Sequence, residues 1–149
     1  MLSAKAKYGL KAMTYLADRE CAGGIQGAEI AETQHIPKKF LDTILLDLKN
    51  HGLINSKKGK GGGYSLARPA SRITVGQIVR ILNGSLALLP CLDETARKPC
   101  TDCGDESACR VRRVMSKAGA AIAEILDETS LRDMAGSNGP RSPILHYDI

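Results

Sequence analysis

Four cysteines lie close together in the second half of this 149-residue chain, and their side chains could bind a metal or change redox state. They are Cys91, Cys100, Cys103 and Cys109, a C-x8-C-x2-C-x5-C pattern. Four soft thiolates suit a tetrahedral site that holds zinc or an iron-sulfur cluster. Structural zinc sites usually show two short CxxC-like pairs, and here only Cys100 and Cys103 form one, so the spacing favours a cluster. A thiol-disulfide switch needs only two of the four and stays open.

A second distinctive segment is the run KKGKGGG at residues 57–63. It separates two short strand candidates, LINS at 53–56 and YSLA at 64–67, so we expect a β-hairpin with the lysines at its tip. A solvated hairpin is one alternative. A nucleotide-binding loop is another, but the GxxxxGK[ST] order of a P-loop is absent.

Duplex DNA is the partner that this hairpin tip favours. Its glycines allow backbone N–H groups to approach a phosphate strand, and a narrow basic tip can enter a minor groove. The tip residues that we expect at the DNA are Lys57, Lys58, Gly59, Lys60 and Gly61.

The helix expected before the hairpin starts against local preference. Helix N-termini favour Asp or Glu, and each cation there costs about 0.3–1 kcal/mol, yet the sequence PKKF places Lys38 and Lys39 in the first turn. With Pro37 expected at the first helical position, Ile36 cannot cap the free N–H groups. A DNA phosphate at this terminus would satisfy those groups and pair with the lysines. Thr43, one turn later, is a candidate for contact with base edges; the alternative is a solvated basic turn.

Helical periodicity predicts the elements that position these lysines. Helices are expected over residues 3–18 and about 27–33, and a third runs from residue 37 to a stop at Gly52. Two helices joined by so short a break are typical of a helix-turn-helix. Three helices followed by a basic hairpin describe a winged helix. The third helix has the strongest apolar pattern, formed by Phe40, Leu41, Ile44, Leu45 and Leu48.

The rest of the chain is divided by its pattern. A fourth helix over 73–84 has Thr74 as N-cap and Gln77 to close a capping box. We predict a winged helix-turn-helix domain over 1–84, a cysteine-rich sensor loop over 85–109, a dimerisation helix over 110–135 and a flexible tail over 136–149. The fold class is therefore mostly α with a small β-hairpin wing. The apolar stripe that invites a partner helix, most simply from a second subunit, is Val111, Val114, Met115, Ala118, Ala121, Ile122, Ile125 and Leu126.

Charge and composition limit the function classes. Residues 1–72 hold 12 Lys and Arg against 6 Asp and Glu, whereas residues 73–149 hold 9 against 10, so a polyanionic partner is expected on the first half. A membrane partner is not expected, because no apolar run approaches about 20 residues. No secretory signal is recognisable, which predicts a cytoplasmic protein. No nucleophile–base or carboxylate pair can be placed in a cleft, so we do not expect an enzyme.

The chain resembles the IscR/NsrR/RirA/CymR-type family of bacterial winged helix-turn-helix transcriptional regulators. The resemblance covers roughly residues 1–135 and rests on three segments. They are AKYGLKAM, IPKKFLDTILLDLKNHGLINSKKGKGGGYSLARPASRITVGQIV and the cysteine-rich loop before the long helix. The resemblance implies a homodimer whose long helices cross and whose two winged helices read a palindromic operator in double-stranded DNA. The positions that match family residues at or near DNA are Tyr8, Lys38, Lys39, Phe40, Thr43, Lys58 and Tyr64.

The same resemblance bears on the cofactor. In cluster-binding members three cysteines hold the cluster, and Cys91 and Cys109 match the first and last of them. The histidine or aspartate that relatives add as fourth ligand is replaced here by Arg112 or Lys7. We therefore expect all four cysteines to serve one iron-sulfur cluster, of two-iron or four-iron type, that tunes a repressor. The alternatives are a zinc or metal-free thiol regulator and a small iron-sulfur electron-transfer protein.

Overall fold

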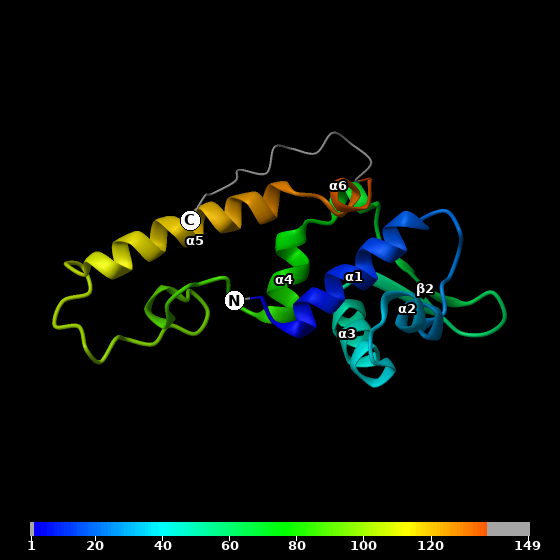
Figure 1. Cartoon of the computed structure of the whole chain (residues 1–149), viewed down its shortest axis with the longest axis horizontal. Coiled ribbons are helices and arrows are strands. Elements are labelled where there is room, and N and C mark those ends of the chain that lie inside the picture. The colour runs from blue at the N-terminus through cyan, green and yellow to red at the C-terminus, as the bar shows by residue number, and fades with distance from the viewer. Residues whose placement is uncertain (1, 137–149) are drawn as a thin grey trace.

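The computed structural model describes residues 2–136, and the predicted tail lies outside this range apart from its first residue. The described chain is helical except for one antiparallel hairpin, in agreement with the predicted winged-helix class (Figure 1). In chain order the elements are α1 (Ala4–Asp18), α2 (Gly27–Gln34), α3 (Lys38–Asn50), β1 (Ile54–Lys57), β2 (Gly63–Leu66), η1 (Ala70–Arg72), α4 (Val75–Asn83), η2 (Pro90–Leu92), α5 (Arg110–Glu128) and α6 (Leu131–Ala135).

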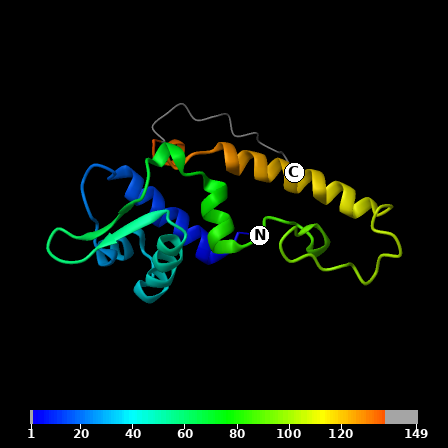
Figure 2. The same ribbon diagram turned by 180° about the vertical axis from the view of Figure 1, so that it is seen from behind.

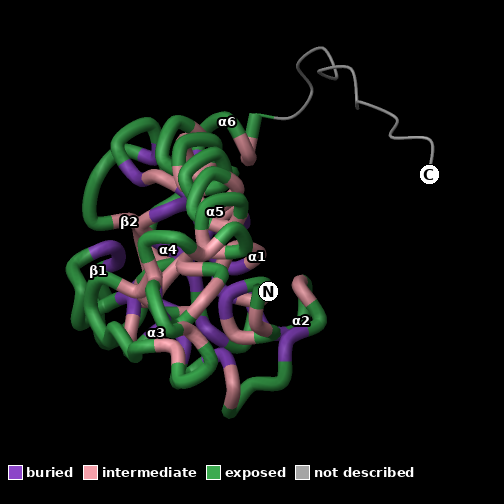
Figure 3. The backbone as a smooth tube through the Cα atoms, turned by 90° about the vertical axis from the view of Figure 1, so that its left-hand side faces the viewer, coloured by how far each residue is buried: buried purple, intermediate pink, exposed green. Residues whose placement is uncertain are grey.

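A single core lies between α1, α3 and α4, with contributions from the hairpin and α6. The apolar positions of α3 recur at three- and four-residue steps, which places them on one face of the helix. Leu41, Ile44, Leu45 and Leu48 of that face are fully buried, as predicted. Figure 3 shows the buried segments concentrated in this part of the molecule. We call residues 2–84 together with α6 the head.

Local caps fix the ends of the head's helices. The Thr74 hydroxyl accepts a hydrogen bond from the Gln77 backbone N–H at 3.2 Å, and the Gln77 side chain accepts one from the Thr74 N–H at 3.1 Å. This is the predicted capping box at the start of α4. Ser3 caps α1, and its own N–H donates to Asn83 Oδ1 at the end of α4. The caps therefore also join α1 to α4.

The hairpin, which we call the wing, begins one residue later and ends one residue earlier than predicted. Ile54 pairs with Leu66 and Lys57 with Gly63, so Lys57 ends a strand and does not lie in the tip. Leu53 is buried before the strand starts, and its carbonyl accepts from the Ala67 N–H at 3.0 Å. Side chains alternate along a strand, so this register exposes Lys57 while Ile54 faces the core.

The long helix α5 lies outside the core. It follows the cysteine loop (residues 85–109), and none of its 19 residues is buried. Its C-terminal end returns to the head, where Leu131 of α6 is fully buried and its N–H donates to the Ile73 carbonyl at 2.7 Å. Figures 1 and 2 show the cysteine loop and the wing at opposite ends of the molecule. None of the helices over residues 2–136 combines the length and apolar character needed to span a bilayer.

Candidate nucleic-acid interface and cysteine cluster

The N-terminus of α3 has no side-chain cap. Pro37 is the N-cap residue and not the first helical residue, which corrects the sequence prediction, because its ψ of 126° is extended. Its carbonyl accepts from the N–H groups of Phe40 and Leu41 at 3.0 and 2.9 Å. The N–H groups of Lys38 and Lys39 therefore have no side-chain cap, and such a terminus favours an anion.

The two lysines of this turn differ in their surroundings. Lys38 pairs with Asp42 one turn later, and both side chains are half exposed. Lys39 is exposed and makes no ion pair within residues 2–136. Thr43 is also exposed, and its hydroxyl donates to the Lys39 carbonyl at 3.3 Å. Lys39 and Thr43 are therefore available to an outside ligand, whereas Lys38 must first leave Asp42.

Tyr8 and Phe40 are packed together, and both lie partly buried against the core. Their rings meet edge to face with centroids 5.6 Å apart, and the Lys7 ammonium lies 5.4 Å from the Tyr8 ring centroid. Edge-to-face pairs of this kind contribute about 0.5–1.5 kcal/mol beyond area burial. The pair therefore joins α1 to α3 and fixes the orientation of the basic turn.

The wing tip is exposed from Lys58 to Gly61. Gly59 and Gly61 adopt φ values of 96° and 77°, which L residues with side chains rarely adopt. None of the three wing lysines forms an ion pair with another described residue. The tip therefore carries cations that no side chain of the described chain neutralises.

The two later glycines of the run serve packing, which the sequence reading missed. A Cβ on Gly63 would lie 2.5 Å from the Ile25 carbonyl oxygen. Tyr64 exchanges backbone hydrogen bonds with Ile25 at 2.8 and 2.9 Å, and Gln26 Nε2 donates to the Gly62 carbonyl at 2.8 Å. The base of the wing is thereby fixed to the segment before α2, so the tip is held at a defined place on the head.

Three of the four loop cysteines lie together. The neighbouring thiols of Cys100 and Cys109 raise the pKa of the Cys103 thiol to about 12, with Cys100 as the larger cause. Cys109 is the N-cap of α5, where its Sγ accepts from the Arg112 N–H at 3.4 Å. This N–H is the main cause of a lowered Cys109 pKa, and the Cys103 thiol lowers it further. Of these two cysteines, Cys103 therefore keeps its proton more strongly, and Cys109 is the more thiolate-like.

The fourth thiol does not join this group. Cys91 is buried in η2 and lines a cavity against α5 that none of the other three cysteines lines. Within residues 2–136, no three His, Cys, Asp or Glu side chains are placed to hold a metal ion. The donor types fit zinc or an iron-sulfur cluster, but this arrangement does not fit the predicted four-cysteine centre.

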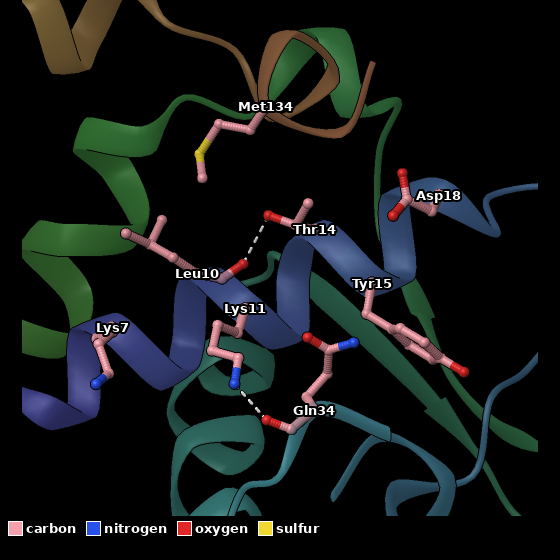
Figure 4. A pocket seen from close by; sticks show the side chains of 8 residues that line it. All are labelled: Lys7, Leu10, Lys11, Thr14, Tyr15, Asp18, Gln34 and Met134. Carbon is pink, nitrogen blue, oxygen red and sulfur yellow. Dashed lines mark hydrogen bonds between the residues drawn. The ribbon is translucent and has the colours of Figure 1, made fainter. Parts of the chain in front are cut away.

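A cavity of about 340 Å³ lies beside α1, and two of its polar side chains donate hydrogen bonds to backbone carbonyls of the same chain. Figure 4 shows the Lys11 ammonium donating to the Gln34 carbonyl at the end of α2 and the Thr14 hydroxyl donating to the Leu10 carbonyl, the latter at 2.8 Å. A cation near a helix C-terminus is favourable. Lys11 therefore stabilises the end of α2, a structural role that was not predicted.

Two arginines beside the cysteine loop were also not predicted as functional. Arg80 of α4 forms two hydrogen bonds with the Asp127 carboxylate of α5, at 2.5 and 2.8 Å. Arg112 of α5 has a buried Nε with no hydrogen-bond partner. Arg80 interrupts an apolar helical segment, which is a signal in the sequence, whereas Arg112 lies in the basic run RVRR at 110–113 and has none.

Comparison with known proteins gives one consistent picture. A family model described as Rrf2, iron-dependent transcriptional regulator, matches residues 2–137. A Rhodobacter capsulatus protein named as an rrf2-like HTH-type transcriptional regulator is 38% identical over 148 residues, which cover 97% of this chain and 99% of that protein. The structure of CymR, the global cysteine regulator of B. subtilis, is 31% identical with a TM-score of 0.77 and covers 91% of this chain and 96% of CymR. T. potens IscR is 29% identical with a TM-score of 0.72, at coverages of 93% and 88%.

Proposed function

This chain belongs to the Rrf2 family of transcriptional regulators, and we propose that it binds a palindromic operator in double-stranded DNA as a homodimer and acts as a repressor. Its family is not one of enzymes. The observation that carries the proposal is the set of uncompensated cations on the wing tip together with the uncapped basic start of α3.

DNA phosphates provide the negative charge that the wing-tip lysines lack and the hydrogen-bond acceptor that the start of α3 lacks. Phosphates neutralise Lys39, Lys58 and Lys60, and a phosphate at the start of α3 accepts from its free N–H groups. Lys38 exchanges its partner Asp42 for a phosphate, and Thr43 contacts base edges beside it. The Tyr8, Phe40 and Tyr64 rings hold the interface rather than read it, because all three pack partly against the core.

The dimer is formed by α5. Val111, Val114 and Ile125 are 59–64% exposed in the single chain, and Ile122 is 41% exposed. A second copy of the same stripe covers these side chains and removes their apolar surface from water. The pair of α5 helices then sets the distance between the two recognition helices α3.

The thiol state of the cysteine loop controls DNA affinity. The loop ends at Cys109, whose sulfur caps α5, so chemistry at that sulfur changes the start of the dimer helix. A hydroperoxide oxidises two of the gathered thiols to a disulfide by accepting two electrons and two protons, and it leaves as an alcohol and water. An iron-sulfur cluster on all four cysteines requires Cys91 to leave its cavity, because the four thiols do not converge in the described arrangement.

Salt-dependent operator binding tests the DNA interface. Genomic selection with full-length protein provides the site, and the affinities of wild type and the Lys58→Ala/Lys60→Ala variant are then measured over a range of salt. Each subunit of the dimer loses two phosphate contacts, four in all, so the magnitude of the slope of log K against log salt falls by about 3.6. Lys117→Ala on α5 is the matched control and leaves the slope unchanged. An unaltered slope in the wing variant, or no selected duplex at all, contradicts the proposal.

Anaerobic purification separates the modes of control. An absorption spectrum with iron, sulfide and zinc counts distinguishes a cluster from zinc and from free thiols. Operator affinity is then compared before and after peroxide treatment, with Cys103→Ser as the variant that removes the thiol next to both Cys100 and Cys109. Colourless, metal-free protein whose affinity falls on oxidation supports a thiol switch, and a peroxide-insensitive affinity contradicts it.

A further inference from the structure

A second cavity, of about 730 Å³, lies between the cysteine loop and α5. Its volume is within the range of sites for small organic molecules. The aliphatic part of its lining includes Leu86, Leu88, Leu92 and Met115. Gly119 keeps the helix side open, because a Cβ built there would meet only Leu88, at 3.9 Å. The lining as a whole is about equally aliphatic and polar, so the cavity offers a chamber of mixed character to a ligand that enters from solvent.

Arg112 places an unsatisfied cation in this chamber. It lines the cavity, its Nε is buried, and that atom has no hydrogen-bond partner among the described residues. Buried polar groups are ordinarily hydrogen-bonded, and a buried charge ordinarily has a counter-charge. Glu106 is near enough to feel the charge of Arg112, but its carboxylate pairs with Arg97. The buried Nε–H of Arg112 thus lacks the acceptor that its burial requires.

The other charged groups of the lining are already satisfied or exposed. Arg80 pairs with Asp127, and Arg97 pairs with Glu106. Asp93 accepts from the N–H groups of Thr95 and Ala96 and from the Thr95 hydroxyl. Glu94 lies exposed to solvent. Asp93 and Glu94 form no ion pair with a described residue, and Arg112 is the cation of this lining that has no carboxylate partner among the described residues.

This cavity is separate from the stripe proposed for dimerisation. Successive residues of a helix turn by about 100°. The α5 residues that line the cavity, among them Arg112, Gly119 and Ala123, fall about a third of a turn from the stripe centred on Ala118 and Ile122. Met115 is the residue shared by both sets. A partner helix on the stripe therefore leaves the cavity in place.

We propose that this cavity binds a small organic carboxylate with an aliphatic body. The carboxylate accepts hydrogen bonds from the Arg112 guanidinium, including its Nε, in the side-on geometry that a planar fork provides. The aliphatic body occupies the chamber beside Leu88, Met115 and Gly119. The inference goes beyond the proposed DNA function, and its binding test needs no operator.

Such a ligand has a direct route to the head. Arg80 lines the same cavity and is one of the residues that join α4 to α5, through Asp127. A carboxylate in the chamber attracts Arg80 as well, and so competes with Asp127 for its guanidinium. Occupancy of the cavity thus loosens the link between the head and the dimer helix.

The test uses hexanoate as the probe and the full-length chain with its thiols reduced. Hexanoate is titrated while backbone chemical shifts are followed by NMR, with 1-hexanol as the uncharged analogue. Wild type shows saturable shifts around Arg112 and Gly119, and 1-hexanol binds at least tenfold more weakly. Arg112→Gln weakens hexanoate binding at least tenfold, whereas Arg113→Gln, its exposed neighbour on α5, leaves it unchanged.

A second variant tests the chamber without changing charge. Gly119→Leu fills the aliphatic space and weakens hexanoate binding at least tenfold, while the thermal midpoint and helical circular dichroism confirm that the chain is folded. Equal binding by wild type and Arg112→Gln overturns the proposal. So does equal affinity for hexanoate and 1-hexanol, which indicates an apolar groove without charge selection, or the absence of saturable binding at millimolar concentrations.

Discussion

The head and the long helix α5 differ in whether their apolar residues are buried within the same chain. In α3, four of thirteen residues are fully buried within the same chain. In α5, nineteen residues carry an apolar stripe just as regular, and none is buried. Both helices have the same kind of pattern, so the difference lies in what packs against them.

This comparison teaches that the head is complete in one copy of the chain and α5 is not. Exposed apolar surface costs about 25 cal/mol for each Å² left in water. The cysteine loop covers part of α5 only through η2 and the cavity residues. This exposed stripe supports our proposals that a second copy of the chain covers α5 and that the cysteine loop responds to thiol chemistry or to a ligand.

The largest effect is expected from the core of the head. Leu48→Ala removes a fully buried side chain and leaves a cavity, so the free energy of unfolding falls by about 3 kcal/mol. Leu46→Ala is the control on the same helix, because Leu46 is 55% exposed, and it changes stability by less than about 0.5 kcal/mol. Denaturant unfolding measures both. Equal losses in the two variants would contradict the assigned orientation of α3.

A charge on the stripe of α5 should break the dimer and spare the head. Ile122→Glu places a carboxylate in the proposed interface, and we expect the dimer dissociation constant to rise about a hundredfold, or about 2.7 kcal/mol. Sedimentation measures the dissociation constant, and circular dichroism checks the head. Arg113→Glu on the opposite face of α5 leaves the dimer intact. If Ile122→Glu leaves the dimer dissociation constant unchanged, the dimer interface does not include the stripe of α5.

Glycine substitutions in the wing and in the cysteine loop should have different effects on stability. Gly63→Ala brings a Cβ to 2.5 Å from the Ile25 carbonyl oxygen at a φ of 134°, and we expect a loss of about 2 kcal/mol. Gly104→Ala meets no atom within 4 Å and should change stability by less than about 0.5 kcal/mol. Thermal unfolding compares the two. A neutral Gly63→Ala would mean that the wing base is not packed against residue 25.

The smallest effect concerns the link between the two regions. Arg80 lowers the pKa of Asp127, chiefly through its hydrogen bond, below the ordinary 3.8. Because the folded pKa is lowered, the contribution of the pair is present above pH 3.8 and is lost as the pH falls through the folded pKa. The pair is nearly half exposed, so Asp127→Asn costs only about 0.5 kcal/mol at neutral pH.

Denaturant unfolding at neutral and acid pH measures the contribution of the Arg80–Asp127 pair to stability. The difference in the free energy of unfolding between wild type and Asp127→Asn becomes smaller as Asp127 is protonated. Glu128→Gln, the exposed neighbour, shows no such difference. A difference that persists unchanged in acid would assign the effect to packing and not to the ion pair.

Much of the head could be predicted because its elements are specified locally. Periodicity located α3 and its buried face, and the Thr74 capping box located the start of α4. Three helices followed by a hairpin predicted the winged-helix class, and the family resemblance, which the comparisons confirm, agrees with it. The strand ends were one residue wrong, because Leu53 and Tyr64 are placed by contacts to the core and to Ile25 rather than by the turn sequence.

The cysteine loop could not be predicted in the same way. Spacing states which thiols are available, but it does not state which of them meet in space. Cys91 is drawn into the cavity by burial in η2, whereas Cys103 and Cys109 are brought together by the start of α5. The unsatisfied Nε of Arg112 is likewise a property of packing and has no sequence signature.

The return of α6 to the head affects how the chain is made. Leu131 completes the core of a unit whose other core residues end at Leu82, so residue 131 must leave the ribosome before that core is full. Chains fold from the N-terminus during synthesis, and an unfinished core exposes apolar surface to aggregation. For the same reason, a truncated protein that stops after α4 lacks its last core side chain, and a DNA-binding fragment cut there starts from a weakened fold.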